Sequence, residues 1–187
     1  MGMSQFSKRA FADAFENMLI STPIEKIRIT HLAKKVGTSP QTFYYHFKDK
    51  YDLIAWIYLQ DYANVTSNQT QTFSATQLLQ MNMVLHQRKH FYRKVFTDQS
   101  QNAIEGYAIT HQMKHLRKAV TEWQSSPITI DQEMAILYHQ YGVLNLFKDW
   151  LFDRLPIDVH TLSQFQYDRT PDFLKKALNS DDFENLQ

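Results

Sequence analysis

The 187-residue sequence has no cysteine, only four glycines and five prolines, and no apolar run long enough to cross a membrane. The missing cysteines exclude a disulfide framework, a thiolate metal site and a cysteine nucleophile. The scarcity of glycine argues against a loop-rich β fold and against a glycine-rich phosphate-binding loop. The N-terminus also lacks the basic and then apolar layout of a signal peptide, so we expect a soluble, cytoplasmic protein.

The residues that are present are those of a globular protein with an uneven charge distribution. Hydrophobic residues make up 43% of the chain and charged residues 21%, and the formal net charge is +1. Residues 1–50 carry a net charge of +4, whereas residues 51–187 carry −3. A basic N-terminal part joined to an acidic remainder is typical of a protein that meets a polyanion at one end.

Three helices are predicted in the basic part. Apolar residues recur at helical spacing over about residues 4–20. Thr30 is expected to cap a second helix, which ends at Gly37, where a left-handed backbone is favourable. Ser39 is expected to cap a third helix over about residues 40–47. Two short helices joined by a turn around a glycine form a helix-turn-helix.

The spacing of three residues supports this motif. Two helices that cross closely need a small residue in the first helix, and Ala33 supplies it. Gly37 follows four positions later in the turn, and Phe43, six further on, is an apolar plug in the second helix. The alternative is an ordinary helical hairpin that binds nothing, and the local positive charge argues against it.

The segment after the turn carries a recognisable pattern. An aromatic stretch, Phe43 to Phe47, precedes a short turn and the sequence Lys-x-x-Leu. With this stretch, residues 7–56 resemble the TetR family of bacterial transcription regulators. The positions that match the family signature are Gly37, Thr42, Tyr44, His46, Phe47, Lys50 and Leu53. Residues 91–96 and 142–150 resemble a Firmicutes branch of this family that contains activators of dihydroxyacetone kinase operons.

The resemblance implies an all-α, TetR-like fold. Its DNA-binding head would be a three-helix helix-turn-helix domain, residues 1–49. A long helix would join this head to a helical regulatory and dimerisation body, residues 50–187. The implied function is a DNA-binding transcription regulator that acts as a homodimer on a palindromic operator, with no enzymatic activity. The alternative is a helical adaptor that binds a protein partner through residues 130–178 and carries a vestigial DNA-binding head.

The third helix of a helix-turn-helix enters the major groove of double-stranded DNA. A glutamine amide can bind adenine and a threonine methyl group can contact thymine, and this helix has no lysine or arginine for guanine. We therefore expect half-sites rich in A·T pairs, unless Lys34, Lys35 or Lys48 reaches a guanine. The expected base contacts are Ser39, Gln41, Thr42 and Tyr45. The expected phosphate contacts are Thr30, Tyr44, His46 and Lys50.

The rest of the chain is predicted to be helical. They are expected at about 50–65, 77–87, 89–96, 101–124, 130–152 and 158–178, with a loop at 66–72 and a new helix capped by Thr170. The helix 130–152 has a wide apolar face, which in TetR-like proteins belongs to a dimer bundle. The expected dimer contacts are Leu137, Leu144, Phe147 and Leu151. Periodicity alone leaves open that this face is core within one chain.

Aromatic side chains suggest a ligand pocket in the body. The candidates are Phe91, Tyr92, Phe96, Tyr107, Trp123, Tyr138 and Tyr141. They could line a site for a small-molecule inducer, or they could simply fill the core. In the activator branch named above, a separate co-activator protein senses the effector, which would leave no true pocket.

Two histidine pairs have a spacing that metal ligands sometimes use. His86 with His90 and His111 with His115 have the i, i+4 spacing that places two imidazoles on one helix face. No carboxylate follows at motif spacing, so solvent-facing histidines are the expectation. We expect neither a metal nor a cofactor.

Overall fold

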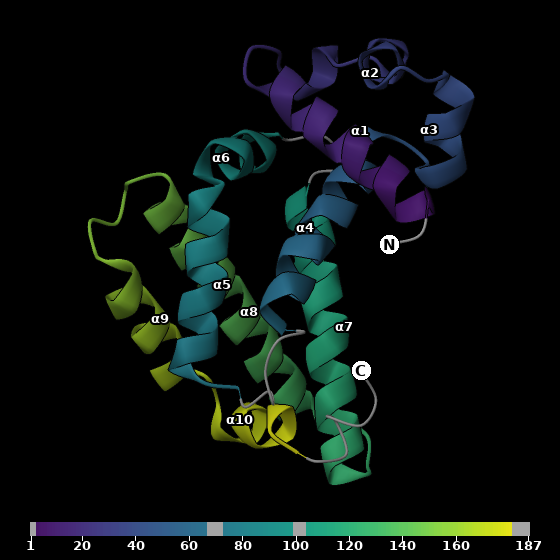
Figure 1. Cartoon of the computed structure of the whole chain (residues 1–187). Helices are drawn as coiled ribbons and strands as arrows, with labels where there is room; N and C mark the ends of the chain where they lie inside the picture. Colours follow the sequence, from purple (N-terminus) through teal and green to yellow (C-terminus); the bar gives the residue numbers. More distant parts are fainter. Residues whose placement is uncertain (1–2, 67–72, 99–103, 181–187) are drawn as a thin grey trace. The chain divides into compact units, whose positions relative to one another are not determined.

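The computed structural model describes residues 3–66, 73–98 and 104–180, and these ranges contain ten α-helices, a short 3₁₀ helix and no strand (Figure 1). The all-α fold is therefore confirmed. The elements are α1 (Met3–Leu19), η1 (Ile24–Lys26), α2 (Ile29–Val36), α3 (Pro40–His46), α4 (Lys50–Thr66), α5 (Ala75–Gln87), α6 (Lys89–Thr97), α7 (Ile104–Gln124), α8 (Ile130–Leu151), α9 (Val159–Asp168) and α10 (Asp172–Leu178). Residues 67–72 of the expected loop and 101–103 of the expected helix 101–124 lie outside the described ranges.

The helices form two compact units. The first unit comprises Met1–Gln60 with Arg88–Glu105, and the second comprises Asp61–Gln87 with Gly106–Gln187. This division differs from the expected boundary between residues 49 and 50. The physical reasons are that α4 continues as one helix past residue 60 and that α6 packs against α1 in the first unit.

The first unit contains the expected helix-turn-helix, formed by α2 and α3. Gly37 follows α2 with φ of 76°, a left-handed conformation that strains residues with a Cβ atom. Ala33 and Phe43 are fully buried where the two helices meet α1. The Phe11 ring of α1 lies edge-on to the Phe43 ring, with 5.2 Å between their centroids. These contacts confirm the spacing of small residue, glycine and apolar plug.

Two expected helix caps are wrong. Thr30 does not cap α2, because Arg28 has the extended backbone and its carbonyl accepts from the N–H groups of His31 and Leu32. Thr30 lies one residue inside the first turn of α2. Thr170 does not cap α10 either, because its buried hydroxyl donates to the Gln166 carbonyl of α9 at 2.9 Å. The N-cap of α2, Arg28, lies two residues before Thr30, and that of α10, Pro171, lies one residue after Thr170.

The second unit has an apolar core and a buried polar contact. The core is built from α7, α8 and α10, and its buried members are Leu116, Ala119, Val120, Ile136, Leu174 and Ala177. Elsewhere, α5 packs against α9. There the Asn82 amide donates to Ser163 Oγ at 3.0 Å and to Gln166 Oε1 at 2.9 Å, and Gln166 donates to the Val143 carbonyl of α8 at 3.3 Å. In the part of the chain that is described, no helix is both long and apolar enough to span a bilayer.

Candidate nucleic-acid interface

Helix α3 presents one buried face and one exposed face. Phe43, and Phe47 just beyond its end, are buried, so the residues between and before them face away from the core. Tyr45 is 82% exposed and Tyr44 is 59% exposed, and Gln41 is also exposed. The side chains of this face combine amide, hydroxyl and aromatic groups, which can form hydrogen bonds and apolar contacts with base edges.

A small network of hydroxyl groups fixes the turn that precedes α3. The Thr38 hydroxyl donates to Thr42 Oγ1 at 2.8 Å. Ser39 caps α3 by accepting from the Thr42 N–H at 3.4 Å, which confirms its predicted capping role. Thr42 is half-buried and its hydroxyl belongs to the turn, so the Thr42 methyl group is the part left for a base contact.

The end of α3 carries a histidine beside a lysine. Partial burial lowers the pKa of His46 below its ordinary value, and the nearby positive charge of Lys8 lowers it further. The Lys8 ammonium lies 5.7 Å from the centroid of the Phe47 ring. Sequence reasoning missed Lys8 as a candidate phosphate contact, although Lys8 contributes to the net charge of +4 over residues 1–50.

Lys50, an expected phosphate contact, has its ammonium group on backbone carbonyls instead. It donates to the carbonyls of Ile24, Glu25 and Ile27 at 2.6, 3.2 and 3.3 Å. The other expected phosphate contacts, Thr30, Tyr44 and His46, are exposed or partly exposed on α2 and α3. All of the expected DNA contacts belong to the first unit, and the Lys50 ammonium is bound there by backbone carbonyls.

The seven aromatic residues expected to line a pocket are divided between the two units. Phe91, Tyr92 and Phe96 are buried in the first unit. The other four, Tyr107, Trp123, Tyr138 and Tyr141, belong to the second unit, and three of these are exposed to solvent.

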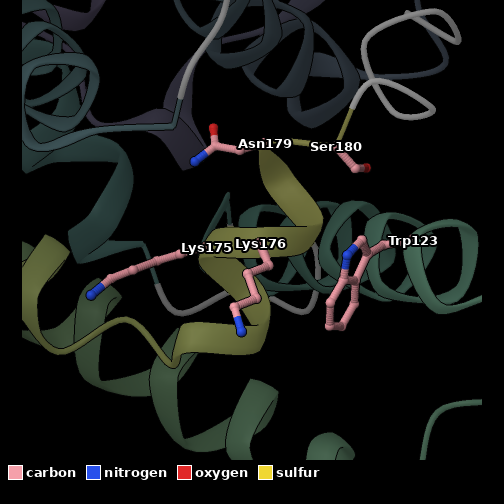
Figure 2. A pocket seen from close by; sticks show the side chains of 5 residues that line it. All are labelled: Trp123, Lys175, Lys176, Asn179 and Ser180. Carbon is pink, nitrogen blue, oxygen red and sulfur yellow. The ribbon is translucent and has the colours of Figure 1, made fainter.

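Trp123 lines a hollow of the second unit, but with a different set of residues. Figure 2 shows the lining side chains, with Lys175 extending away from Trp123. The hollow is lined by Trp123, Lys175, Lys176, Asn179 and Ser180. None of the other six aromatic candidates belongs to this set.

Helix α8 also has two different faces. Of the expected dimer contacts, Leu144, Phe147 and Leu151 are buried in the chain and Leu137 is half-buried. This differs from the expectation, because a side chain already covered by its own chain offers little surface to a partner. The exposed apolar residues of the helix are Ile130, Met134, Tyr138 and Tyr141, which we call the α8 stripe. Two of them, Ile130 and Tyr138, are 81% and 85% exposed.

Four of the five histidines of the second unit, His86, His111, His115 and His139, pack against aromatic rings or are partly buried, and His160 is exposed. His111 stacks on Tyr107, with 6.1 Å between ring centroids, and Tyr62 lies edge-on to both His111 and His115. Burial lowers the pKa of His115 to about 4, helped by the positive charge of His111 and Lys118. Burial, with the charge of Lys175, lowers the pKa of His139 to about 4. Among the described residues there is no cluster of three or more side chains of the metal-binding types.

Models of known protein families match both the N-terminal and the C-terminal part of the chain. A family model described as bacterial regulatory proteins, tetR family, matches residues 7–57. A second model, described as a transcriptional regulator C-terminal region, matches residues 74–168.

Individual relatives agree with these matches. The HTH-type dhaKLM operon transcriptional activator DhaS of Lactococcus lactis subsp. lactis (strain IL1403) is 25% identical over 97 residues. These residues are 51% of this chain and 52% of that protein, so the match spans about half the length of the relative. Among solved structures, the dihydroxyacetone kinase operon activator DhaS has a TM-score of 0.61 at 16% identity. That alignment covers 87% of this chain and 92% of the other, and it shows a likeness of fold.

Proposed function

Because this chain belongs to the TetR family of bacterial regulatory proteins, and is a transcription regulator rather than an enzyme, we propose that it binds a palindromic DNA operator as a homodimer. The observation that carries this proposal is the helix-turn-helix of the first unit, in which Phe43 anchors α3 and the opposite face is exposed. Two such heads on one duplex would read two half-sites related by a two-fold axis.

Base recognition is assigned to the exposed face of α3 and its N-terminus. Gln41 is placed to form two hydrogen bonds with an adenine, and the Thr42 methyl group to contact a thymine methyl. Ser39 and Tyr45 complete the set of base contacts. Since α3 contains no lysine or arginine, the half-sites should be rich in A·T pairs.

Phosphate contacts are assigned to side chains around this face. Thr30 in the first turn of α2, Tyr44 and His46 can each donate or accept a hydrogen bond. Lys8 adds a positive charge beside His46. These contacts would fix the orientation of the head on the duplex without reading its sequence.

Dimerisation is assigned to the α8 stripe. Its residues are spaced four, four and three apart along the helix, the spacing that helices use when they pack side by side. Phe165 of α9, 46% exposed in the same unit, adds a further apolar side chain. An exposed apolar stripe on a soluble protein usually marks an interface, and a second copy of the chain would cover it.

Control of DNA binding is assigned to a co-regulator protein in preference to a small inducer. The resemblance to the dihydroxyacetone kinase activators supports this choice, since a separate protein senses the effector in that branch. The dispersal of the seven aromatic candidates, some buried and some exposed, supports it as well. A small-molecule inducer remains the alternative, and a ligand that changes operator affinity in the purified protein would favour it.

Selection of bound duplexes from a random pool tests the proposal. The purified protein should enrich an inverted repeat, and its affinity should fall steeply as the salt concentration rises. If no sequence is enriched even at low salt, the isolated protein does not read DNA. The adaptor hypothesis would then explain the chain better.

A further inference from the structure

The turn between α2 and α3 contains a threonine that is bonded to both helices. The Thr38 N–H donates to the Ala33 carbonyl of α2 at 2.9 Å, and together with the left-handed Gly37 this bond closes the end of that helix. The half-buried Thr38 hydroxyl donates to Thr42 Oγ1 of α3 at 2.8 Å. Thr38 therefore connects the end of α2 to the first turn of α3 by one backbone and one side-chain hydrogen bond.

These bonds fix the side chain of Thr42. A threonine in a helix ordinarily populates two χ1 rotamers, which place its hydroxyl and its methyl group differently. In the rotamer observed, Thr42 Oγ1 accepts from Thr38 and also lies 3.3 Å from Ser39 Oγ. The other rotamer would take Oγ1 away from the turn and leave the Thr38 donor without this acceptor. The turn thus selects the rotamer in which the hydroxyl, and not the methyl group, meets the other two hydroxyls.

We propose that Thr38 is a positioning residue for base recognition, which holds the Thr42 methyl group in place for the C5-methyl group of a thymine. This inference rests on the proposed DNA binding, and it makes a base preference depend on a residue that is assigned no base contact. In the major groove the C5-methyl group distinguishes thymine, whereas a threonine hydroxyl can bond to groups on different bases. Exchanging the two groups on Thr42 would therefore replace a selective contact with an unselective one.

Two substitutions separate the donor of Thr38 from its shape. Thr38→Val nearly keeps the shape but puts a methyl group where the donor was. Thr42 Oγ1 then faces an apolar group, so the rotamer that turns the Thr42 methyl group towards residue 38 becomes favoured. Thr38→Ser keeps the donor and removes the methyl group, so it should hold Thr42 as the parent does.

Deoxyuridine is the probe, because its base differs from thymine only by the C5-methyl group. The test uses the full-length protein and the operator duplex enriched by selection. Each thymine of the half-site is replaced in turn by deoxyuridine, in both half-sites at once. The ratio of the affinities for the thymine and the deoxyuridine duplex measures the methyl contact, and a general change in the affinity of a variant cancels in this ratio.

The parent should prefer thymine at the contacted position by about fourfold per half-site, or about fifteenfold for the two half-sites together, as expected for the burial of one methyl group. Thr42→Ser, which keeps the hydroxyl and removes the methyl group, identifies that position. Thr38→Val should lower the ratio there to below about twofold per half-site, since one hydrogen bond changes the rotamer populations by about two- to tenfold. Thr38→Ser should keep the ratio of the parent.

A double variant tests whether Thr38 acts through Thr42. Thr42→Val has two methyl groups, so one of them takes the position of the threonine methyl group whichever residue stands at position 38. The ratio for Thr42→Val should therefore be the same with and without Thr38→Val, whereas two independent effects would add.

Thr121→Val is the matched control. The exposed Thr121 hydroxyl donates to the Arg117 carbonyl within α7 at 2.9 Å, so this variant loses a threonine hydrogen bond in the second unit. It should keep the ratio of the parent. Circular dichroism and titration to the stoichiometric end point give the folded and active fraction of each variant.

Three outcomes would overturn the inference. The first is a folded Thr38→Val protein with the ratio of the parent, because Thr38 would then not position Thr42. The second is an equal loss of the ratio in Thr38→Ser, which would assign the effect to packing and not to the donor. The third is a parent ratio of about one at every thymine. Should Thr38→Val fail to fold, Thr38→Ala, which also lacks the donor, decides the question. A parent protein that enriches no duplex would instead contradict the proposed function itself.

Discussion

Helices α3 and α8 each expose a row of side chains, and the two rows differ in chemistry. The exposed face of α3 carries an amide and two phenol rings, in Gln41, Tyr44 and Tyr45. The α8 stripe also has two phenol rings, in Tyr138 and Tyr141, but it adds Ile130 and Met134, which have no group that hydrogen-bonds strongly to water. Covering Ile130 and Met134 with another surface would be favourable, because it would remove purely apolar side chains from water. This difference separates the surface proposed for DNA from the surface proposed for a second copy.

The largest expected effect comes from placing a charge in the α8 stripe. Tyr138→Asp should convert the dimer into a monomer, because an aspartate would be buried without a partner between the two copies. Since each head alone binds weakly, operator affinity should fall by about a hundredfold or more. Sedimentation equilibrium gives the mass, and a fluorescence anisotropy titration gives the affinity.

Thr76→Asp is the control for this variant, since Thr76 is exposed in the first turn of α5, where an acidic residue is favourable. It should remain a dimer with the affinity of the parent. A Tyr138→Asp protein that stays dimeric at nanomolar concentration would show that the stripe does not form the interface.

A substitution on the buried face of α8 should have a different effect. Leu151 is fully buried, so Leu151→Ala should lower the free energy of unfolding by about 2–5 kcal/mol through the cavity that it leaves. The folded fraction should still dimerise and bind the operator. Urea denaturation measures the first effect and sedimentation the second. If Leu151→Ala instead abolished the dimer without lowering stability, the contacts expected from the sequence, and not the α8 stripe, would form the dimer interface.

Two half-buried histidines predict that the second unit loses stability in acid. The pKa of His115 and of His139 is about 4 in the folded chain, below the value of about 6.5 expected when unfolded. A lowered pKa means that the unfolded chain binds more protons, so stability is complete above about pH 6.5 and falls progressively as the pH drops towards 4. The loss should reach up to about 3 kcal/mol for each histidine.

Urea midpoints measured between pH 7.5 and 4 check this prediction. His115→Gln and His139→Gln should each make the stability less dependent on pH, while His160→Gln, at an exposed position, should not. An unchanged pH dependence in both half-buried variants would contradict the assignment.

The smallest expected effect lies on the exposed face of α3. Gln41→Ala should cost about 1–3 kcal/mol at one base position of each half-site and relax the preference there. Tyr44→Phe, which keeps the ring and removes the hydroxyl, should weaken binding to all sequences alike. Repeating the duplex selection with both variants distinguishes these results. A Gln41→Ala protein with the preferences of the parent would remove Gln41 from the base contacts.

Local spacing was enough to predict the helix-turn-helix. Ala33, Gly37 and Phe43 lie within eleven residues, and the backbone of one turn brings them together. The left-handed φ of Gly37 and the complete burial of the other two follow from that short-range geometry. The Ser39 cap was predictable for the same reason, since its partner Thr42 is three residues away.

Long-range packing could not be predicted in the same way. Helix α8 has apolar residues on more than one face, so its periodicity gave no means of telling Leu144, which is buried, from Tyr138, which is exposed. The carbonyls that Lys50 binds are 23–26 residues away in the sequence, and no local pattern marks them. The aromatic candidates for a pocket share only their residue type, which does not encode the unit in which each one folds.

The buried amide of Asn82 has a consequence for how two copies would assemble. It donates to two acceptors on α9, Ser163 and Gln166, and a slip of α9 by one turn, about 5.4 Å, would leave it without them. The axial position of α9, and with it that of Phe165, is thereby locked within the single chain. The surfaces of two copies would therefore already be ordered before they associate, and little conformational entropy would be lost on association. The association rate should then be limited by diffusion and orientation and not by refolding.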